Sequence, residues 1–309
     1  MLEAALVGTG GMMPLPNRFL SSMLCRVNGS MILIDSGEGT QVSLKLLGWG
    51  FKNIDIICFT HFHADHISGL PGLLLTIGNT GREEPLRMFG PPGLQRIVES
   101  LRVIAPELPF DIIFYEWEPG ASRDIALSND LTLRAFPVYH GTPCFAYSLT
   151  LGRRGKFDLE RAKQGNVPMK IWSALQKQNV PFIVYNDIPY TPDMVLGPPR
   201  PGLKLAYCTD TRPKKGLAEF AFGADLLICE GLYGEAYKQE KAAAHKHMTF
   251  AEAAKIAKDA QAEELWLTHF SPALPDPKQF LSAAAKIFPN TVIGRDRMTK
   301  TLRFIDDDD

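Results

Sequence analysis

Long apolar runs are absent from this sequence. Even stretches such as residues 70–77 fall far short of the roughly 20 residues that a membrane-spanning helix needs. Residues 1–8 have neither the basic start nor the long apolar segment of a secretory signal, so we do not expect export. An excess of charge is absent too, because 33 Lys and Arg residues face 34 Asp and Glu residues. No global field therefore favours nucleic acid or a membrane surface, and any such binding must depend on a local patch.

Cysteine is scarce. Its five residues are odd in number and form no CxxC pair; they are Cys25, Cys58, Cys144, Cys208 and Cys229. This pattern predicts reduced thiols in the core of a cytoplasmic protein.

The overall composition is that of a folded globular protein. Hydrophobic residues make up 45% of the chain and charged residues 22%, which excludes disorder, collagen-like sequence and a coiled coil. A chain of 309 residues is long for one domain, but a single αβ/βα sandwich can contain it.

Strand-like and helical segments alternate along most of the chain, which predicts a layered α/β fold. Short β-rich runs bounded by glycine or polar residues predict strands at 4–8, 23–27, 31–34, 54–60, 112–117, 131–138, 203–209, 226–229 and 265–268. Helical patterns cover 40–47, 67–77, 93–103, 249–259 and 277–288.

Residues 151–200 interrupt this alternation between two predicted strands. A polar, proline-rich interruption of this length is more typical of an inserted arm than of a structureless loop. Its first part, 152–170, has six basic side chains against two acidic ones, an excess of four. The basic residues are Arg153, Arg154, Lys156, Arg161, Lys163 and Lys170. A solvated surface segment and an RNA-binding patch both fit this pattern.

Three of the seven histidines lie within six residues, in the string His61-Phe62-His63-Ala64-Asp65-His66. The string follows the strand predicted at 54–60, and α/β folds place their sites at such strand ends. Imidazole and carboxylate groups are suitable ligands for Zn²⁺ and similar ions. His61 and His63 alternate onto one side, while Asp65 and His66 follow a turn, so one motif can serve two adjacent cations.

Further candidate ligands close other apolar strands. His140 follows the strand predicted at 131–138, Asp210 follows 203–209, and His269 follows 265–268. A single polar residue at a strand end is usually structural. Three of them, together with the histidine cluster, predict a set of seven ligands.

These motifs resemble the metallo-β-lactamase superfamily and, within it, the ribonuclease Z family. The string THFHADH matches the HxHxDH signature of the superfamily. The family is indicated by VGTGG at 7–11, DSGEGTQ at 35–41, HADHISGLPGLL at 63–74 and VLGPPRPG at 195–202, and by their order. The resemblance covers essentially the whole chain and implies a four-layer αβ/βα sandwich in one domain, with residues 151–200 as the family's tRNA-binding arm.

The resemblance also implies roles for individual residues. His61, His63 and His140 would hold one divalent ion, Asp65, His66 and His269 the second, and Asp210 would bridge both. Asp65 would also orient and deprotonate the attacking water. His247 would donate a proton to the leaving oxygen with Glu230 as its partner, although His247 could instead be a surface residue at a helix entry.

Four segments differ from the family pattern, and all concern substrate recognition. The loop 14–19 keeps Arg18, a candidate RNA contact, but lacks the usual lysine. The segment 229–232 keeps only the acid Glu230, residues 271–273 lack the usual arginine, and residues 167–170 replace the arm's Gly-Pro element. None of these differences affects a predicted metal ligand.

The leading hypothesis is therefore a dinuclear phosphodiesterase that removes the 3′ trailer from precursor tRNA, without a role for DNA or membrane. Zn²⁺ is the expected metal, with Mn²⁺ or Fe²⁺ as alternatives, and the resemblance implies a homodimer. The second hypothesis is a related hydrolase of a small phosphodiester or another ester, whose arm is a dimer contact or a lid. The third is an RNA-binding or scaffold protein without catalysis, against which the complete ligand set argues.

Overall fold

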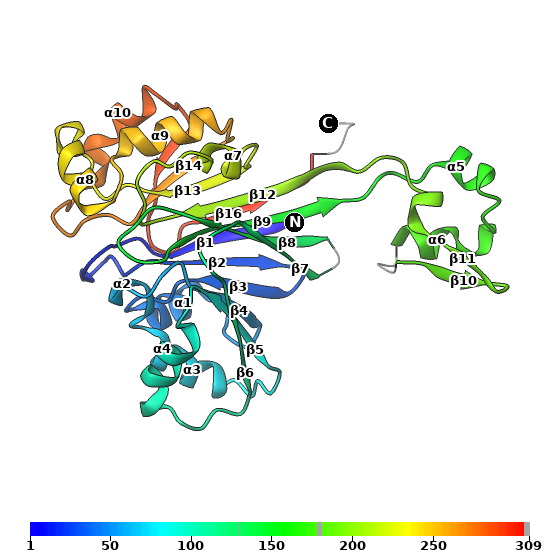
Figure 1. The fold of residues 1–309 in the computed structure, drawn as a ribbon, viewed down its shortest axis with the longest axis horizontal. Coiled ribbons are helices and arrows are strands. Elements are labelled where there is room, and N and C mark those ends of the chain that lie inside the picture. Colours follow the sequence, from blue (N-terminus) through cyan, green and yellow to red (C-terminus); the bar gives the residue numbers. More distant parts are fainter. Residues whose placement is uncertain (129, 178–180, 306–309) are drawn as a thin grey trace.

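The structure is a computed structural model that describes residues 1–128, 130–177 and 181–305. Within these ranges, two mixed seven-stranded sheets face each other (Figure 1). The first sheet has the order β16 (Thr299–Leu302), β1 (Leu2–Gly8), β2 (Ser22–Val27), β3 (Ser30–Ile34), β4 (Ile54–Cys58), β5 (Leu86–Gly90) and β6 (Ile112–Glu116). The second has the order β15 (Thr291–Ile293), β14 (Leu265–Thr268), β13 (Leu226–Glu230), β12 (Arg200–Cys208), β9 (Phe145–Arg153), β8 (Leu131–Pro137) and β7 (Arg123–Ser128).

Each sheet changes from antiparallel to parallel pairing at its central strand. In the first sheet, β16, β1, β2 and β3 pair antiparallel, whereas β3, β4, β5 and β6 pair parallel. In the second sheet, β7, β8, β9 and β12 pair antiparallel, whereas β12, β13, β14 and β15 pair parallel. The parallel halves are the parts of the fold whose strands end at a common edge.

Helices cover the outer face of each sheet. The first sheet packs against α1 (Thr40–Leu47), α3 (Leu70–Gly78) and α4 (Leu94–Leu101), which η1 (Arg102–Ile104) follows. The second packs against α7 (Leu217–Ala221), α9 (Phe250–Asp259) and α10 (Leu281–Ala285), which η4 (Pro277–Phe280) precedes. The remaining helices of this half are η3 (Ala236–Lys238) and α8 (Gln239–His245).

Three hydrophobic clusters correspond to the three interfaces between the layers. The cluster between the sheets includes Leu6, Phe145, Tyr147 and Trp266, all with at most 1% of their surface exposed. The other two lie between each sheet and its helices. The predicted αβ/βα sandwich is therefore confirmed. The helix predicted at 67–77 corresponds to α3, which begins only at Leu70, while Ile67 is the last residue of a separate short helix, α2 (Ala64–Ile67). Gly69 lies between the two helices, and its amide donates to the Ser36 carbonyl (2.9 Å).

The long strands β9 and β12 carry a separate lobe at the end of the molecule opposite α2 (Figure 1). Because β9 ends at Arg153 and β12 begins at Arg200, the arm comprises residues 154–199, slightly fewer than the predicted 151–200. It contains α5 (Leu159–Gln164), α6 (Met169–Lys177), β10 (Ile183–Tyr185), β11 (Ile188–Tyr190) and η2 (Pro192–Met194).

The arm has its own hydrophobic cluster, which includes Ile171, Leu175 and Val195. At the base of the arm, the segment that enters it and the segment that leaves it lie very close together, since a Cβ atom on Gly155 would lie 2.0 Å from the Gly197 carbonyl oxygen. The five cysteines are buried, and none is disulfide-bonded. Among the helices of the described ranges, none has the length and apolar character that crossing a bilayer requires.

Candidate metal centre

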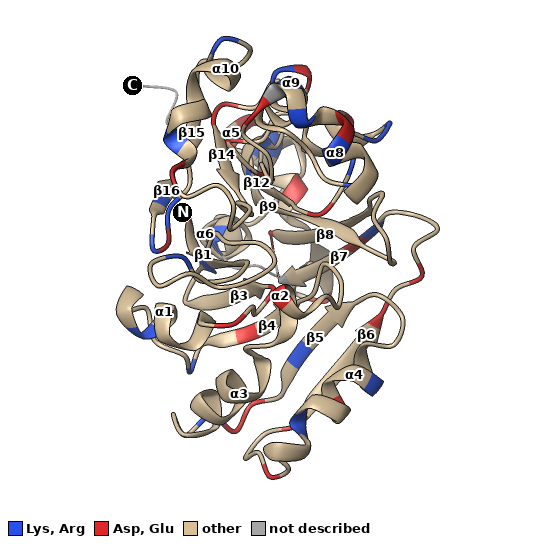
Figure 2. Cartoon of the chain, turned by 90° about the vertical axis from the view of Figure 1, so that its left-hand side faces the viewer, with Lys and Arg blue, Asp and Glu red and all other residues tan. Residues whose placement is uncertain are grey.

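The predicted ligands meet where strands of the two sheets end. Figure 2 views the molecule from the end opposite the arm, with α2 between the two sheets (Figure 2). His61 follows β4 and leads into α2, while Asp210 and His269 follow β12 and β14 of the second sheet. His140 follows β8. Ligands from both halves of the chain thus converge on one edge of the sandwich, as α/β folds favour.

Four donor atoms form a first group that could hold a metal ion. The Nδ1 atom of His63 lies 2.9 Å from Nε2 of His61 and 3.2 Å from Nε2 of His140. The Oδ1 atom of Asp210 lies 3.9 Å from His61 Nε2 and 3.8 Å from His140 Nε2. Three imidazole nitrogens and one carboxylate oxygen therefore surround a single point, which is the donor set of a zinc site.

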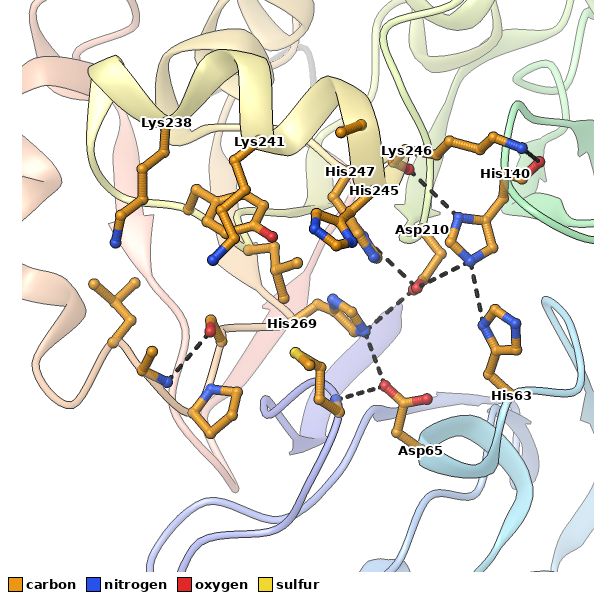
Figure 3. Close-up of a pocket in the computed structure, with 18 of the residues that line it drawn as sticks. His63, Asp65, His140, Asp210, Lys238, Lys241, His245, Lys246, His247 and His269 are labelled. Carbon is orange, nitrogen blue, oxygen red and sulfur yellow. Dashed lines mark hydrogen bonds and ion pairs between the residues drawn. The ribbon is translucent and has the colours of Figure 1, made fainter.

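A second group lies beside the first and consists of Asp65, His66 and His269. His269 Nε2 lies 3.3 Å from His66 Nε2 and 3.4 Å from Asp65 Oδ2. The Oδ2 atom of Asp210 lies 3.1 Å from His66 Nε2 and 3.3 Å from His269 Nε2. Asp210 thus directs one carboxylate oxygen to each group, which is the arrangement of a bridging ligand. Figure 3 shows its carboxylate between His140 and His269.

Buried polar atoms without partners indicate that the site is incomplete without cations. Asp210 Oδ2 is buried and, although it lies 3.1 Å from His66 Nε2, it accepts no hydrogen bond of good geometry from the described residues. Buried polar atoms are nearly always hydrogen-bonded or bound to an ion. The donors are imidazole nitrogens and carboxylate oxygens, which suit Zn²⁺, Mn²⁺ and Fe²⁺. The residues present therefore fit a pair of divalent cations.

A hydrogen bond from the protein orients one of the ligands from behind. Asp35, which follows β3 and is fully buried, lies with Oδ2 2.8 Å from His66 Nδ1. The same carboxylate accepts from the amide of Thr60 (2.8 Å) and from its hydroxyl. Such partners fix the tautomer of a metal-ligating histidine. In the sequence, Asp35 stands out only as part of the family string at 35–41, although it closes an apolar strand just as Asp210 does.

The electrostatics of the cluster favour the ligand forms of four side chains. Burial lowers the pKa of His61 and of His140, so both are held neutral. Burial alone would raise the pKa of Asp210, yet the surrounding imidazoles hold it well below its usual value. The same opposition, with His269 as the main imidazole, lowers the pKa of Asp65. Neutral imidazoles and ionised carboxylates are the forms that bind metal.

His66 differs from the other ligands. Burial alone would lower its pKa, but the carboxylates of Asp210 and Asp35 raise it well above the usual value for histidine. The two flanking carboxylates therefore favour the protonated form of this imidazole when no cation is bound. Because a metal ligand must be deprotonated, binding of a cation at this group must release that proton.

The predicted proton donor lies next to the ligands. His247 Nδ1 is 3.0 Å from Glu230 Oε2 and 3.8 Å from Asp210 Oδ1. Glu230 is completely buried and accepts hydrogen bonds from the amides of Thr211 and Met248. Burial alone would lower the pKa of His247, but the Glu230 carboxylate raises it to about 9. His247 also lies close enough to Asp210 and His269 to share an ion with them, which leaves a ligand role as its alternative.

The residues predicted to contact RNA do not form one patch. Arg18 is half-buried, and its guanidinium donates to the carbonyls of Leu274 (2.9 Å) and Pro275 (3.0 Å), beside the metal centre. Arg153 lies on β9 and contacts Phe304 and the Ile305 carbonyl. The other four are in the arm or at its base.

Those four differ in their surroundings. Arg154 lies 3.6 Å from Asp130, and Lys156 is exposed at the base of the arm. Arg161 and Lys163, on α5, are exposed and pair with acids of the arm itself (3.7 and 3.4 Å).

The fold and the site together define a protein of the metallo-β-lactamase superfamily. The metallo-beta-lactamase superfamily matches residues 16–156, and the beta-lactamase superfamily domain matches residues 194–270. The residues between the two matches, 157–193, all belong to the arm.

More narrowly, the chain belongs to the ribonuclease Z family. It is 53% identical over 304 residues to the ribonuclease Z of Clostridium kluyveri and 51% identical over 304 residues to that of Lachnoclostridium phytofermentans. Each comparison covers 98% of this chain and 99% of the relative. The crystal structure of human tRNase Z, short form, superimposes with a TM-score of 0.70 at 25% identity, covering 98% of this chain and 100% of that one. The predicted family is therefore confirmed.

Proposed function

We propose that this protein is a dinuclear metal-dependent phosphodiesterase, an endoribonuclease that removes the 3′ trailer from precursor tRNA. The observation that carries the proposal is the division of the Asp210 carboxylate between two adjacent donor groups. Two cations held side by side are suited to phosphodiester hydrolysis, since they can clamp one phosphoryl group between them.

The two donor groups would hold the cations as the sequence analysis proposed, with His61, His63 and His140 around one ion and Asp65, His66 and His269 around the other. When bound, the ions supply Lewis-acid chemistry, which activates water and offsets negative charge on phosphate. Zn²⁺ is our first assignment because the donors are nitrogen and oxygen atoms in a compact cluster, and Mn²⁺ or Fe²⁺ would fit the same atoms.

The remaining steps belong to side chains of the chain itself. The amide of Met12 donates to Asp65 Oδ2 (2.7 Å), which fixes a carboxylate that can accept the proton of the attacking water. His247 would donate its proton to the departing ribose 3′-oxygen, a poor leaving group. Glu230 would orient His247 and keep it protonated, consistent with the raised pKa of that imidazole.

The arm would supply affinity for the body of the tRNA. Its exposed cations, among them Arg161 and Lys163, can contact phosphates without reading sequence. The arm extends away from the metal centre of its own chain, so we infer that it serves the centre of a second copy in a homodimer. Precursor tRNA as the substrate agrees with the cytoplasmic location expected from the reduced cysteines.

The test is a side-by-side assay of the metal-loaded protein on a precursor tRNA and on a chromogenic phosphodiester, with the cut position mapped. We expect a single cut at the start of the trailer, and a rate on tRNA that falls steeply with salt. Hydrolysis of the chromogenic compound with no cut in the tRNA would favour the small-phosphodiester hydrolase. Two metal ions per chain without any hydrolysis would favour an RNA-binding protein. The mass of the full chain in solution tests the homodimer.

A further inference from the structure

The pocket that contains the candidate metal centre continues beyond the ligands. It has a volume of about 630 Å³ and lies between the ligand side chains, the loop 271–274, and a wall formed by η3 and α8. Figure 2 shows α8 at the same end of the molecule as α2. Neither metal binding nor proton donation by His247 requires this wall.

Two lysines extend from the wall into the pocket (Figure 3). Lys238 forms an ion pair with Glu235, so its charge is offset locally. Lys241 lies beside the ring of Tyr233, with its ammonium nitrogen 5.8 Å from the ring centre. It forms no ion pair with any residue that the structure describes.

The side chain of Lys246, the third lysine of the pocket, points elsewhere. The ammonium group of Lys246 donates to the His140 carbonyl (3.4 Å) and lies 5.3 Å from the ring of Tyr139. Lys241 is therefore the pocket lysine whose charge is neither paired nor directed to the protein backbone. The uncompensated positive charge of the wall is concentrated at its side chain.

An ammonium group on a flexible stem is a point charge that suits a phosphate, whereas planar bidentate recognition is left to arginine. The ammonium nitrogen of Lys241 lies over the buried Tyr233 ring at the pocket, which gives a cation–π contact. A substrate that places one phosphodiester at the metal centre, and that continues as a polyanion, would bring its next phosphates to this wall.

We propose that Lys241 binds a phosphate of the single-stranded trailer, just beyond the scissile bond. The inference rests on the proposed function, because it takes the substrate to be an RNA strand. A pocket of about 630 Å³ is of the size that encloses a small ligand. It can accept a few unpaired nucleotides but not the paired stem of a tRNA, which must remain outside. The strand in the pocket is therefore the trailer.

The test measures binding, so it does not depend on tRNA cleavage. Calorimetry would compare uridine 5′-monophosphate with 5′-phosphorylated triuridylate, which carries two further phosphates, on the metal-loaded full chain. We expect Lys241→Gln to weaken the trinucleotide about tenfold, as for a lost charge-assisted hydrogen bond, and to leave the mononucleotide nearly unchanged. The slope of affinity against salt concentration for the trinucleotide should fall by about one.

Lys255→Gln is the matched control, because Lys255 is an exposed lysine on α9 that pairs with Asp259 (3.1 Å) away from the pocket. It removes the same charge from the molecule and should change neither affinity. Equal losses for both ligands in Lys241→Gln, or a trinucleotide affinity equal to that of the unsubstituted protein, would overturn the proposal. If the protein cuts no precursor tRNA but the trinucleotide result holds, the proposed function fails and the phosphate subsite stands.

Discussion

Replacement of Asp35 by asparagine tests whether the acid behind His66 sets the affinity of the metal centre. In the native chain, Asp35 Oδ2 lies 2.8 Å from His66 Nδ1, while Oδ1 accepts from the Thr60 amide (2.8 Å). Asparagine keeps the shape but has one donor and one acceptor at its end. Its oxygen must remain at the Thr60 amide, so its NH₂ group faces His66 Nδ1.

The consequence for His66 follows from its two nitrogens. A donor opposite Nδ1 favours the tautomer with the proton on Nε2, and Nε2 is the atom that faces Asp210 Oδ2 at 3.1 Å. The proton then occupies the position of the metal. Loss of such a partner costs about 10- to 100-fold in metal affinity, which is about 1.4–2.8 kcal/mol. We expect that loss at the group formed by Asp65, His66 and His269, and little change at the other.

The measurement is a titration of the metal-free protein with Zn²⁺ in competition with a chromophoric chelator, which resolves two affinities per chain. Asp296→Asn is the control, because Asp296 accepts from the Thr9 hydroxyl and the Phe19 amide (both 2.7 Å) but contacts no histidine. Two unchanged affinities in folded Asp35→Asn would refute the reasoning. Equal losses in both variants would attribute the effect to the removal of a hydrogen-bonded carboxylate charge and not to the contact with His66.

Three further changes test the assignments of the site and the arm. Asp210→Asn should abolish hydrolysis of every substrate and lower metal content while the chain stays folded; activity with two metals bound would contradict its bridging role. His247→Ala should lower kcat on RNA by about 10²- to 10⁴-fold but affect a p-nitrophenyl phosphodiester, whose leaving group needs no proton, much less. Equal losses on both substrates, or lost metal, would make His247 structural or a ligand. Joining Arg153 to Arg200 through a short Gly/Ser turn, which removes residues 154–199, should reduce cleavage of tRNA far more than that of the small phosphodiester, and parallel losses would make the arm structural.

The candidate ligands could be recognised in the sequence because of their positions. His140, Asp210 and His269 each close an apolar strand, and the structure places all of them beside the cluster at 61–66. One polar side chain at a strand end is usually structural, but three of them near a histidine cluster are informative. Glu230, the last residue of β13, followed the same logic and lies against His247.

Elements whose patterns are ambiguous were harder to predict. Neither β5 (Leu86–Gly90) nor β9 (Phe145–Arg153) was predicted from the sequence, although β9 pairs with both β8 and β12. In β9, Ser148 and Thr150 interrupt the apolar run. Because β9 leads directly into the polar arm, its sequence resembles that of a loop. The arm's interior was hidden for a related reason, because its small cluster is formed by residues from several short elements that have no clear period.

Close approach was equally invisible in the sequence. A Cβ atom on Gly11 would lie 2.6 Å from the ring of His269, so the loop after β1 can pass over this ligand only because residue 11 is glycine. The string at 7–11 had been used only as a family feature. Its physical role is to pack against His269, one of the candidate ligands. Because the two residues are more than 250 positions apart, no local sequence pattern encodes this contact.

An aspartate with the same backbone conformation follows the central strand of each sheet. This conformation explains why Asp35 was not recognised from the sequence as a candidate site residue. Both β3 and β12 lie where antiparallel pairing changes to parallel pairing, and an aspartate follows each of them. Asp35 and Asp210 both have a positive φ, 60° and 54°, which bends the chain sharply and directs the carboxylate inward. Aspartate tolerates a positive φ, but its presence in a sequence does not predict this conformation as a glycine would. One aspartate faces the donor atoms, and the other supports His66 from behind. The two halves of the fold thus place an aspartate in the same backbone conformation. Only the histidines around each one distinguish the candidate ligand, Asp210, from Asp35, which binds a candidate ligand.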